Sequence, residues 1–372
     1  MNFLNKIRNL FFVKYAVKIF TRFERPISSF SLVSGFVFDA ITLKRVDTLW
    51  ENFWIIIHFL VVAVCIVMIN RKEMEGIDPK DPDKIHFWLI NILQFTFGGL
   101  LSVFLVFYFR SSTLLVSWPF LLILLAAFTA NESLKKHYSR ISFQITLFYL
   151  SIFLFAIFIV PVVLHRIGQD VFLLSGAVSL VLIGLFILIL GYFGREKFHK
   201  SKKILLISIF GIFFITNILY FLKLIPPIPL SLKDAGVYHS ITRDVSGNYL
   251  AEQENKKWSD YFKFYEDFHK TPNSPIYAYS SIFSPTLINA DIIHVWEHYD
   301  ETSGKWVTVS TVDLKVTGGR ENGYRTYSMQ EGLVPGKWRV NVETSHGDVV
   351  GRLRFNIINV MTKPTLEKIT NY

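Results

Sequence analysis

The chain has 372 residues, of which 51% are hydrophobic and 16% aromatic, and its formal net charge is +10. This apolar content exceeds what a soluble protein of the same length needs for its core, so the composition indicates a membrane protein. Residues 1–225 carry 23 Lys/Arg and 12 Asp/Glu, which leaves 16 Lys/Arg and 17 Asp/Glu for residues 226–372. The C-terminal part therefore lacks the basic excess that a nucleic-acid partner requires, and the positive excess belongs to the part expected beside lipid headgroups.

Residues 1–25 interleave basic and aromatic side chains. Lys14, Lys18 and Arg22 follow one another at intervals of four, which places them on one stripe of a helix beside an aromatic surface. This pattern predicts an amphipathic helix lying in the interface of an anionic leaflet. Lysines at this spacing would interrupt the apolar core of a signal peptide, so we do not expect a cleaved leader.

Seven apolar stretches follow, each near the roughly 20 residues that cross a bilayer. They cover residues 27–43, 53–70, 87–109, 113–130, 143–164, 171–193 and 204–225. The first is the weakest, because several serines and Asp39 fall within it. It either crosses fully or forms a shallow, re-entrant helix.

The distribution of basic residues predicts the orientation of these spans. With the N-terminus in the cytoplasm, the inner segments hold eighteen Lys/Arg and the outer loops hold four. Basic residues collect in short cytoplasmic segments, so this contrast favours a cytoplasmic N-terminus. An odd number of spans then places the C-terminal domain outside, and we expect a multi-pass protein of the bacterial cytoplasmic membrane.

Polar groups are few within the spans. Asp39 is the one acidic candidate, with Arg45 just beyond it, and Gln94 and Gln144 read as isolated amides. Ionisable groups inside a membrane are costly and are often functional. Asp39 is interpreted either as a capping or Arg45-paired residue near the interface, or as part of a transport site. Glycines and alanines in the spans favour close helix packing over a permeation path.

The segment 226–275 connects the two halves. Three prolines within residues 226–229 end the last helix and predict a short, stiff stalk. Residues 235–242 suit a strand. The aromatic spacing of residues 258–269 predicts an amphipathic helix, which either packs on the β domain or lies on the outer face of the membrane.

From residue 276 the hydrophobic period changes to two. Strands are predicted over residues 276–283, 291–299, 306–316, 324–329, 337–344 and 349–358. Glycine-containing turns separate them, and short antiparallel strands at this density predict an immunoglobulin-like β-sandwich over residues 276–372. The domain plan is thus an interfacial helix (1–25), a transmembrane helical domain (26–225), a connecting segment (226–275) and this sandwich.

Three consecutive pieces of the C-terminal domain form a specific pattern. They are HVWEHYD (294–300), TVDLKVTGGRENGYRTYS (311–328) and PGKWRVNVETSHGDVVGRLRF (335–355). In this order they resemble the bacterial domain-of-unknown-function family 2914, over about residues 285–358. The resemblance implies a membrane-anchored, immunoglobulin-like domain, and it supplies no catalytic residues.

Two groups of residues are candidates for binding. His294, Trp296 and His298 alternate along one strand and so share a face. They could ligate a metal or hold a sugar ring, or the tryptophan could fill a core with histidines at its margin. The second group combines arginine with aromatic side chains, as binding surfaces often do. Its members are Arg320, Tyr324, Arg325, Tyr327, Trp338 and Arg339.

Catalytic signatures are absent from the sequence. It has no nucleophile elbow, phosphate-binding loop, dinucleotide fingerprint or zinc-protease motif, and its single cysteine, Cys65, allows no intrachain disulfide. We therefore expect no cofactor and no metal. The predicted function is a non-enzymatic membrane protein whose extracytoplasmic sandwich binds an envelope protein or glycan. The alternative is a transporter or lipid-handling protein with the sandwich as an accessory domain, and the oligomeric state is left open.

Overall fold

The computed structural model describes residues 24–43, 47–74, 84–134, 137–193, 195–245, 248–255, 263–285, 288, 290–320 and 322–371. Nearly all of the expected interfacial helix over residues 1–25 lies outside these ranges. The chain forms two compact units, one of residues 1–107, 123–151 and 183–209 and the other of residues 108–122, 152–182 and 210–372.

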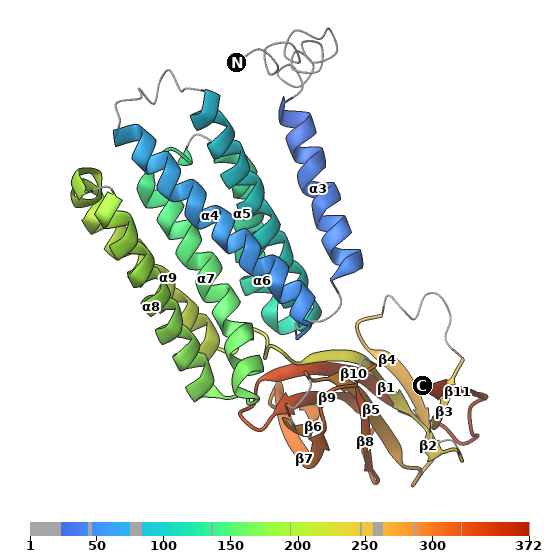
Figure 1. Ribbon diagram of the computed structural model, residues 1–372. Helices are drawn as coiled ribbons and strands as arrows, with labels where there is room; N and C mark the ends of the chain where they lie inside the picture. The colour runs from blue at the N-terminus through green and yellow to red at the C-terminus, as the bar shows by residue number, and fades with distance from the viewer. Residues whose placement is uncertain are drawn as a thin grey trace, which may run out of the picture. The chain divides into compact units, whose positions relative to one another are not determined.

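The described part of the N-terminal half is helical (Figure 1). Its helices are α3 (Glu24–Thr42), α4 (Leu49–Met74), α5 (Lys84–Arg110), α6 (Leu114–Ser133), α7 (Ile141–Leu164), α8 (Gln169–Phe193) and α9 (Arg195–Phe221). Each overlaps a predicted span, although α9 begins at Arg195, before the predicted start at residue 204. Six of them, α4 to α9, are long and apolar enough to cross a membrane. The apolar part of α3 is shorter, Val33–Thr42, as expected for the weakest of the seven stretches.

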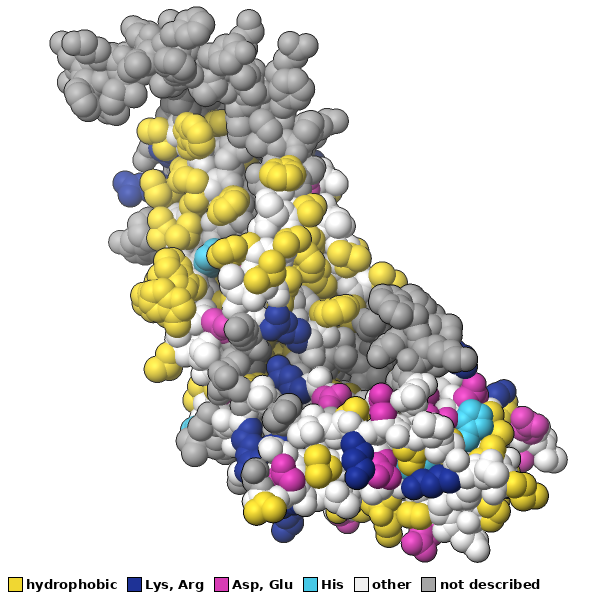
Figure 2. Space-filling model, turned by 90° about the vertical axis from the view of Figure 1, so that its right-hand side faces the viewer, with side chains coloured by type: hydrophobic (Ala, Val, Ile, Leu, Met, Phe, Trp, Pro, Cys, Tyr) yellow, Lys and Arg dark blue, Asp and Glu magenta, His cyan; other side chains and the backbone are white. Residues whose placement is uncertain are grey.

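The surface of these helices is unsuited to water. Large apolar side chains such as Phe95, Leu188 and Ile207 are 75%, 72% and 73% exposed. Figure 2 shows hydrophobic side chains gathered over the helices, whereas charged side chains of both signs gather over the strands. Contiguous apolar surface of this extent matches a lipid environment.

The C-terminal half is built of strands. They are β1 (Ser231–Tyr238), β2 (Ser240–Arg243), β3 (Tyr249–Glu254), β4 (Glu266–Lys270), β5 (Ile276–Phe283), β6 (Ala290–Asp300), β7 (Lys305–Val316), β8 (Tyr324–Gln330), β9 (Gly336–Thr344), β10 (Val349–Asn359) and β11 (Leu366–Asn371). Three sheets result, with the strand orders β1-β5-β8, β4-β10-β9-β6-β7 and β11-β3-β2. The six predicted strands correspond to β5 to β10 within one or two residues at each end.

The segment expected to connect the two halves contributes strands to these sheets. β1 pairs antiparallel with β5, and β4 pairs parallel with β10. The predicted helix over residues 258–269 is wrong for its described end, because Glu266–Lys270 is a strand. Phe268 is only 4% exposed and faces Ile357 across the pairing. The aromatic ring of Phe268 can pack in a sheet core as well as on an amphipathic helix. Because β10 offers an edge for pairing, the segment forms a strand here.

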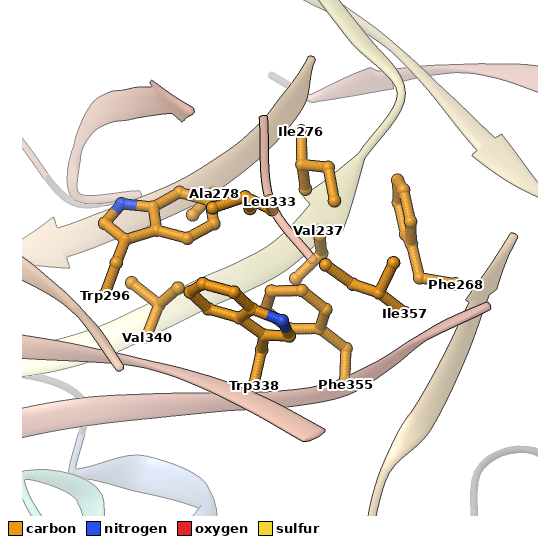
Figure 3. Close-up of a cluster of buried hydrophobic side chains, with 10 residues drawn as sticks. All are labelled: Val237, Phe268, Ile276, Ala278, Trp296, Leu333, Trp338, Val340, Phe355 and Ile357. Atoms are coloured by element: carbon orange, nitrogen blue, oxygen red, sulfur yellow. The ribbon is translucent and has the colours of Figure 1, made fainter. Parts of the chain in front are cut away.

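Two tryptophans dominate the main core of the β region. Trp296 and Trp338 point into a cluster that also contains Val340 and Phe355, as Figure 3 shows. Val237 of β1 and residues of β5 belong to the same cluster, so the β1-β5-β8 sheet packs against the five-stranded sheet.

The opposite face of the β1-β5-β8 sheet is buried as well. Tyr279 of β5 packs with Tyr238, Ile241 and Tyr249 in a separate cluster that includes residues of β2 and β3. The β11-β3-β2 sheet therefore covers this face. In the predicted two-sheet sandwich each sheet has one buried face. Here the β1-β5-β8 sheet is buried on both of its faces.

Candidate functional site

His294 of β6 lies in the core of the β region. Its Nε2 is 2.9 Å from the Oγ of Ser280, and its Nδ1 is 2.8 Å from the Oγ of Ser328. The indole N–H of Trp296 donates to the same Ser328 oxygen at 3.0 Å. Burial lowers the pKa of His294 from 6.5 to about 4. The imidazole is thus neutral near neutral pH, so one of its ring nitrogens donates and the other accepts.

His298, the third residue of this predicted group, lies at the margin of the same core. Its ring packs against Trp338, with centroids 4.8 Å apart. Within the ranges that the structure describes, no group of three or more His, Cys, Asp or Glu side chains could hold a metal ion. The structure therefore places His294, Trp296 and His298 on one face, and that face is the packed interior.

The second predicted group is divided between two sheets. Arg320, Tyr324, Arg325 and Tyr327 lie on or just before β8, whereas Trp338 and Arg339 lie on β9. The indole of Trp338 is buried and donates to the carbonyl oxygen of Val334 at 2.8 Å. Arg320 is exposed, with its guanidinium 5.1 Å from the ring centroid of Tyr324. Arg339 points to the opposite face of β9 from Trp338.

The residues of β8 surround a tyrosine of the third sheet. Arg325 lies 5.8 Å from the ring centroid of Tyr249, and Tyr327 packs edge-on against the same ring at 5.8 Å. Arg243 donates to the Tyr249 hydroxyl at 2.6 Å. These contacts join the β1-β5-β8 sheet to the β11-β3-β2 sheet, so we assign this cluster a packing role.

A polar network covers the outer face of the five-stranded sheet. Glu297 of β6 faces Arg339 of β9, whose Nε and Nη2 groups donate to the two carboxylate oxygens at 2.6 and 3.1 Å. Asn341 donates to Glu297 at 2.7 Å and accepts from the Nε of Arg352 on β10 at 2.5 Å. The network thus crosses three adjacent strands.

Arg354 lies next to this network, two residues after Arg352 on β10. It lies opposite Arg339 in the register of β9 and β10. Its guanidinium is 4.2 Å from the ring centroid of Phe264 and 5.9 Å from that of Tyr265. Its Nε and Nη1 atoms are buried and have no hydrogen-bond partner among the described residues. A buried donor left without an acceptor costs about 1–3 kcal/mol, and a charged one costs more.

We call Arg339, Arg352 and Arg354 the arginine face. Burial is the main reason that the pKa of Arg352 is lowered, and the charges of Arg339 and Arg354 lower it further. Burial also lowers the pKa of Arg354, with a contribution from Arg339 in the same direction. Two carboxylates, Glu297 and Glu343, accompany the three guanidinium groups; burial is the main reason that the pKa of Glu343 is raised. An added anion would relieve the repulsion among the three cations.

Aromatic side chains flank the arginine face on both sides. Trp306 lies under the guanidinium of Arg339 at 4.4 Å and packs against Tyr299 at 5.2 Å. Phe264 and Tyr265 flank it beside Arg354. Guanidinium groups bind phosphate or carboxylate oxygens in a bidentate fashion, and aromatic rings offer apolar contact surface beside them. The arrangement suits an anionic ligand that also has an apolar or ring-shaped part.

Two of the three arginines were missed by the sequence reasoning, which selected Arg339 alone. The alternation of β10 contained the signal, because Arg352 and Arg354 lie two residues apart and opposite in phase to Phe355. Their position beside Arg339 depends on the pairing of β10 with β9, which the sequence does not show.

Asp39 is bonded to a serine of another helix. Its Oδ2 accepts a hydrogen bond of 2.5 Å from the Oγ of Ser102 on α5. The ring of His58 on α4 packs against Gly99 of α5, one turn before Ser102. Arg45 lies outside the described residues.

The amides Gln94 and Gln144 are not isolated, contrary to the sequence interpretation. Asn70 donates to Gln144 at 2.8 Å, and Gln144 donates to the carbonyl oxygen of Tyr138 at 2.5 Å. Gln94 exchanges hydrogen bonds with Asn131, which also accepts from the Tyr138 hydroxyl. Buried polar groups in an apolar bundle need partners, and these residues supply them to one another.

Comparison with known proteins identifies a family segment and no function. The family model described as "Protein of unknown function (DUF2914)" matches residues 289–357. No curated protein matches the chain. The solved structure of Pseudomonas fluorescens alkylpurine DNA glycosylase AlkC, bound to DNA containing an abasic site analog, matches 81% of this chain and 96% of that chain at 10% identity. The TM-score of this match is 0.22.

Proposed function

We propose that this chain, which carries a DUF2914 segment, is a multi-pass membrane protein whose C-terminal β region binds an acidic glycan of the bacterial envelope without catalysis. In this proposal the N-terminus is cytoplasmic, and the β region is an immunoglobulin-like domain outside the cytoplasmic membrane. The apolar helices and the distribution of basic residues support this orientation.

The observation that carries the proposal is the state of Arg354. Its Nε and Nη1 lack acceptors among the described residues, while its guanidinium lies against Phe264 and close to Arg339 and Arg352. A phosphate or carboxylate oxygen would supply the missing acceptor and add negative charge where three cations meet. The flanking aromatic rings favour a glycan over a free inorganic anion, because sugar rings add apolar contacts.

Binding can be measured with the full chain in lipid nanodiscs. The probes are poly(glycerol phosphate), the carboxylated polysaccharide hyaluronate, and neutral dextran as the uncharged comparison. We expect an acidic polymer to bind and dextran not to bind. Affinity should fall as salt is raised, because the contacts are between charges.

Variants at matched arginines locate the site. Arg354→Gln should weaken binding by about tenfold or more, and Arg354→Lys should restore part of it, because a lysine keeps the charge but loses the planar fork. Arg320→Gln is the control, since Arg320 also lies over a tyrosine ring but belongs to another part of the β region. Equal binding by Arg354→Gln and the parent protein, or no binding of either acidic polymer, would overturn the proposal. Capture of an envelope protein with the same arginine dependence would replace the glycan with a protein ligand.

A second function, transport or lipid handling by the helices, is favoured by one observation. Asp39, Ser102 and His58 bring ionisable and polar groups together within the apolar bundle. Such groups often mark pathways for ions or protons.

A further inference from the structure

Two aromatic rings from the segment that precedes β4 cover the guanidinium group of Arg354. The Cζ atom of Arg354 lies 4.2 Å from the ring centroid of Phe264 and 5.9 Å from that of Tyr265. Its Nε and Nη1 atoms are buried and have no acceptor among the described residues. An acidic group can reach these two nitrogen atoms only after a covering group has moved, and the two rings lie directly against the guanidinium.

The register of β4 explains where the two rings lie. β4 pairs parallel with β10, and the first pair of this ladder joins Glu266 to Phe355. Tyr265 and Arg354 each come one residue earlier, so they lie beside each other where the ladder begins. Phe264 and Tyr265 therefore lie outside the ladder, and the backbone pairing of β4 does not hold them.

The rings and the strand that follows them are held differently. Phe268 of β4 is 4% exposed in the main core, and the backbone N–H of His269 donates to Glu254 at 2.7 Å. Phe264, in contrast, is 62% exposed. The rings can consequently leave Arg354 while β4 keeps its place in the sheet.

The forces at Arg354 favour an anion over the rings. A cation–π contact at an exposed site is weak, so the covered arrangement is only a few times more populated than the open one. A carboxylate or phosphate forms two charge-assisted hydrogen bonds with a guanidinium group, and these are much stronger. A neutral polymer has no such group, so it does not displace the rings.

We infer that Phe264 and Tyr265 form an aromatic strap that closes the arginine face in the ligand-free chain and that an acidic glycan displaces. The inference rests on the proposed function, because it takes the ligand to be bound by Arg354. The strap reduces the apparent affinity for the glycan, since only the open fraction of the chains can bind it. It also makes the face selective, because a ligand must carry an anionic group to open it.

Trp306 provides the comparison on the other side of the arginine face. Its ring centroid lies 4.4 Å from the guanidinium of Arg339. The Nε and Nη2 groups of Arg339 already donate to Glu297, at 2.6 and 3.1 Å. This ring therefore lies on a guanidinium that is already paired, so its removal should not raise the affinity for a glycan.

Binding by the full chain in lipid nanodiscs tests the strap, with poly(glycerol phosphate) and hyaluronate as the probes. Phe264→Ala should bind the acidic polymer about three- to sixfold more tightly than the parent, because the open fraction rises. Phe264→Trp should bind more weakly, since an indole makes the strongest cation–π contact. Met361→Ala is the control at a residue that follows β10 and is 95% exposed. Neither this control nor Trp306→Ala should bind more tightly than the parent.

Modification of Arg354 by phenylglyoxal, an arginine reagent, tests the strap without any glycan. Mass spectrometry should show that Arg354 reacts at least about threefold faster in Phe264→Ala than in the parent, and more slowly in Phe264→Trp. Equal or weaker glycan binding by Phe264→Ala, when binding by the parent depends on Arg354, would disprove the strap and leave the proposed function standing. Faster modification of Arg354 without binding of either acidic polymer would disprove the proposed function, and with it the glycan as the displacing ligand.

Discussion

Glu297 and Arg339 face each other across β6 and β9, and two hydrogen bonds of 2.6 and 3.1 Å join the carboxylate to the guanidinium. Their side chains are only 11% and 18% exposed. The pair is therefore shielded from water and from salt. The carboxylate of Glu297 neutralises the charge of Arg339, one of the three arginines of the arginine face.

Replacing Glu297 should destabilise the β region and strengthen anion binding together. Glu297→Gln leaves Arg339 without its counter-charge, and breaking a buried pair typically costs about 3–5 kcal/mol. The urea midpoint of the near-ultraviolet circular dichroism of the full chain should fall accordingly. Glu301→Gln, at an exposed turn, should leave the midpoint unchanged. Affinity of the folded variant for acidic polymer should rise; a decrease would argue against the arginine face as the binding site.

His294 should make the stability of the β region depend on pH. Its pKa is about 4 in the fold against 6.5 for an ordinary histidine. As pH falls below 6.5, His294 binds a proton in the unfolded chain, whereas in the folded chain it binds this proton only near pH 4. Stability should therefore decline across this interval, by about 3 kcal/mol in all. Urea midpoints measured at successive pH values check this.

The matched pair for that experiment is His294→Gln and His298→Gln. An amide at position 294 can still bond to Ser280 and Ser328 but does not titrate, so most of the slope between pH 6.5 and about 4 should disappear. His298→Gln should preserve the slope, because His298 lies at the margin of the core. A slope that survives His294→Gln would assign the acid sensitivity to other groups.

Glu254 should hold β4 in place. It accepts from His239 at 3.1 Å, from the His269 ring at 2.6 Å and from the His269 backbone N–H at 2.7 Å. Burial alone would raise the pKa of Glu254, but these hydrogen bonds outweigh burial and lower it. A carboxylate with a lowered pKa contributes stability above the ordinary value of 4.5, and this stability is lost as pH falls through the folded value.

Glu254→Gln should accordingly speed hydrogen exchange at the His269 amide by about tenfold. Glu252→Gln is the control on the same strand, since its ion pair with Lys363 spans 3.8 Å and the Lys363 side chain is 67% exposed. Unchanged exchange in Glu254→Gln would show that pairing with β10 is sufficient to hold β4.

The orientation of the chain can be tested by fusions. Alkaline phosphatase is active only outside the cytoplasm, so a fusion after residue 230 should be active and one after residue 200 should be inactive. The basis is the contrast of eighteen inner against four outer basic residues. The opposite pair of activities would reverse the topology and place the β region in the cytoplasm.

Elements with a clear hydrophobic period could be predicted closely from the sequence. The strand at Ile276–Phe283 was placed at its observed ends, and each helix from α3 to α9 overlaps a predicted span. Prediction failed at β4, because the aromatic spacing that ends at Phe268 fits both a helix and a strand. β3 and β11 were missed because their polar residues at the sheet surface give little periodic signal.

The sequence by itself determined that the chain has apolar helices followed by a β region, since both follow from local periodicity and from proline positions. It also determined that Arg339 and Trp338 point in opposite directions. Only the tertiary structure decided that Arg354 and Arg339 lie on the same face of the sheet. It also decided that His294 is buried between Ser280 and Ser328. The hydrogen bond from Ser102 to Asp39, 63 positions apart in the chain, is a third such feature. The physical reason is that strand register and helix docking are set by how distant surfaces pack, and local spacing carries no record of the distant partner.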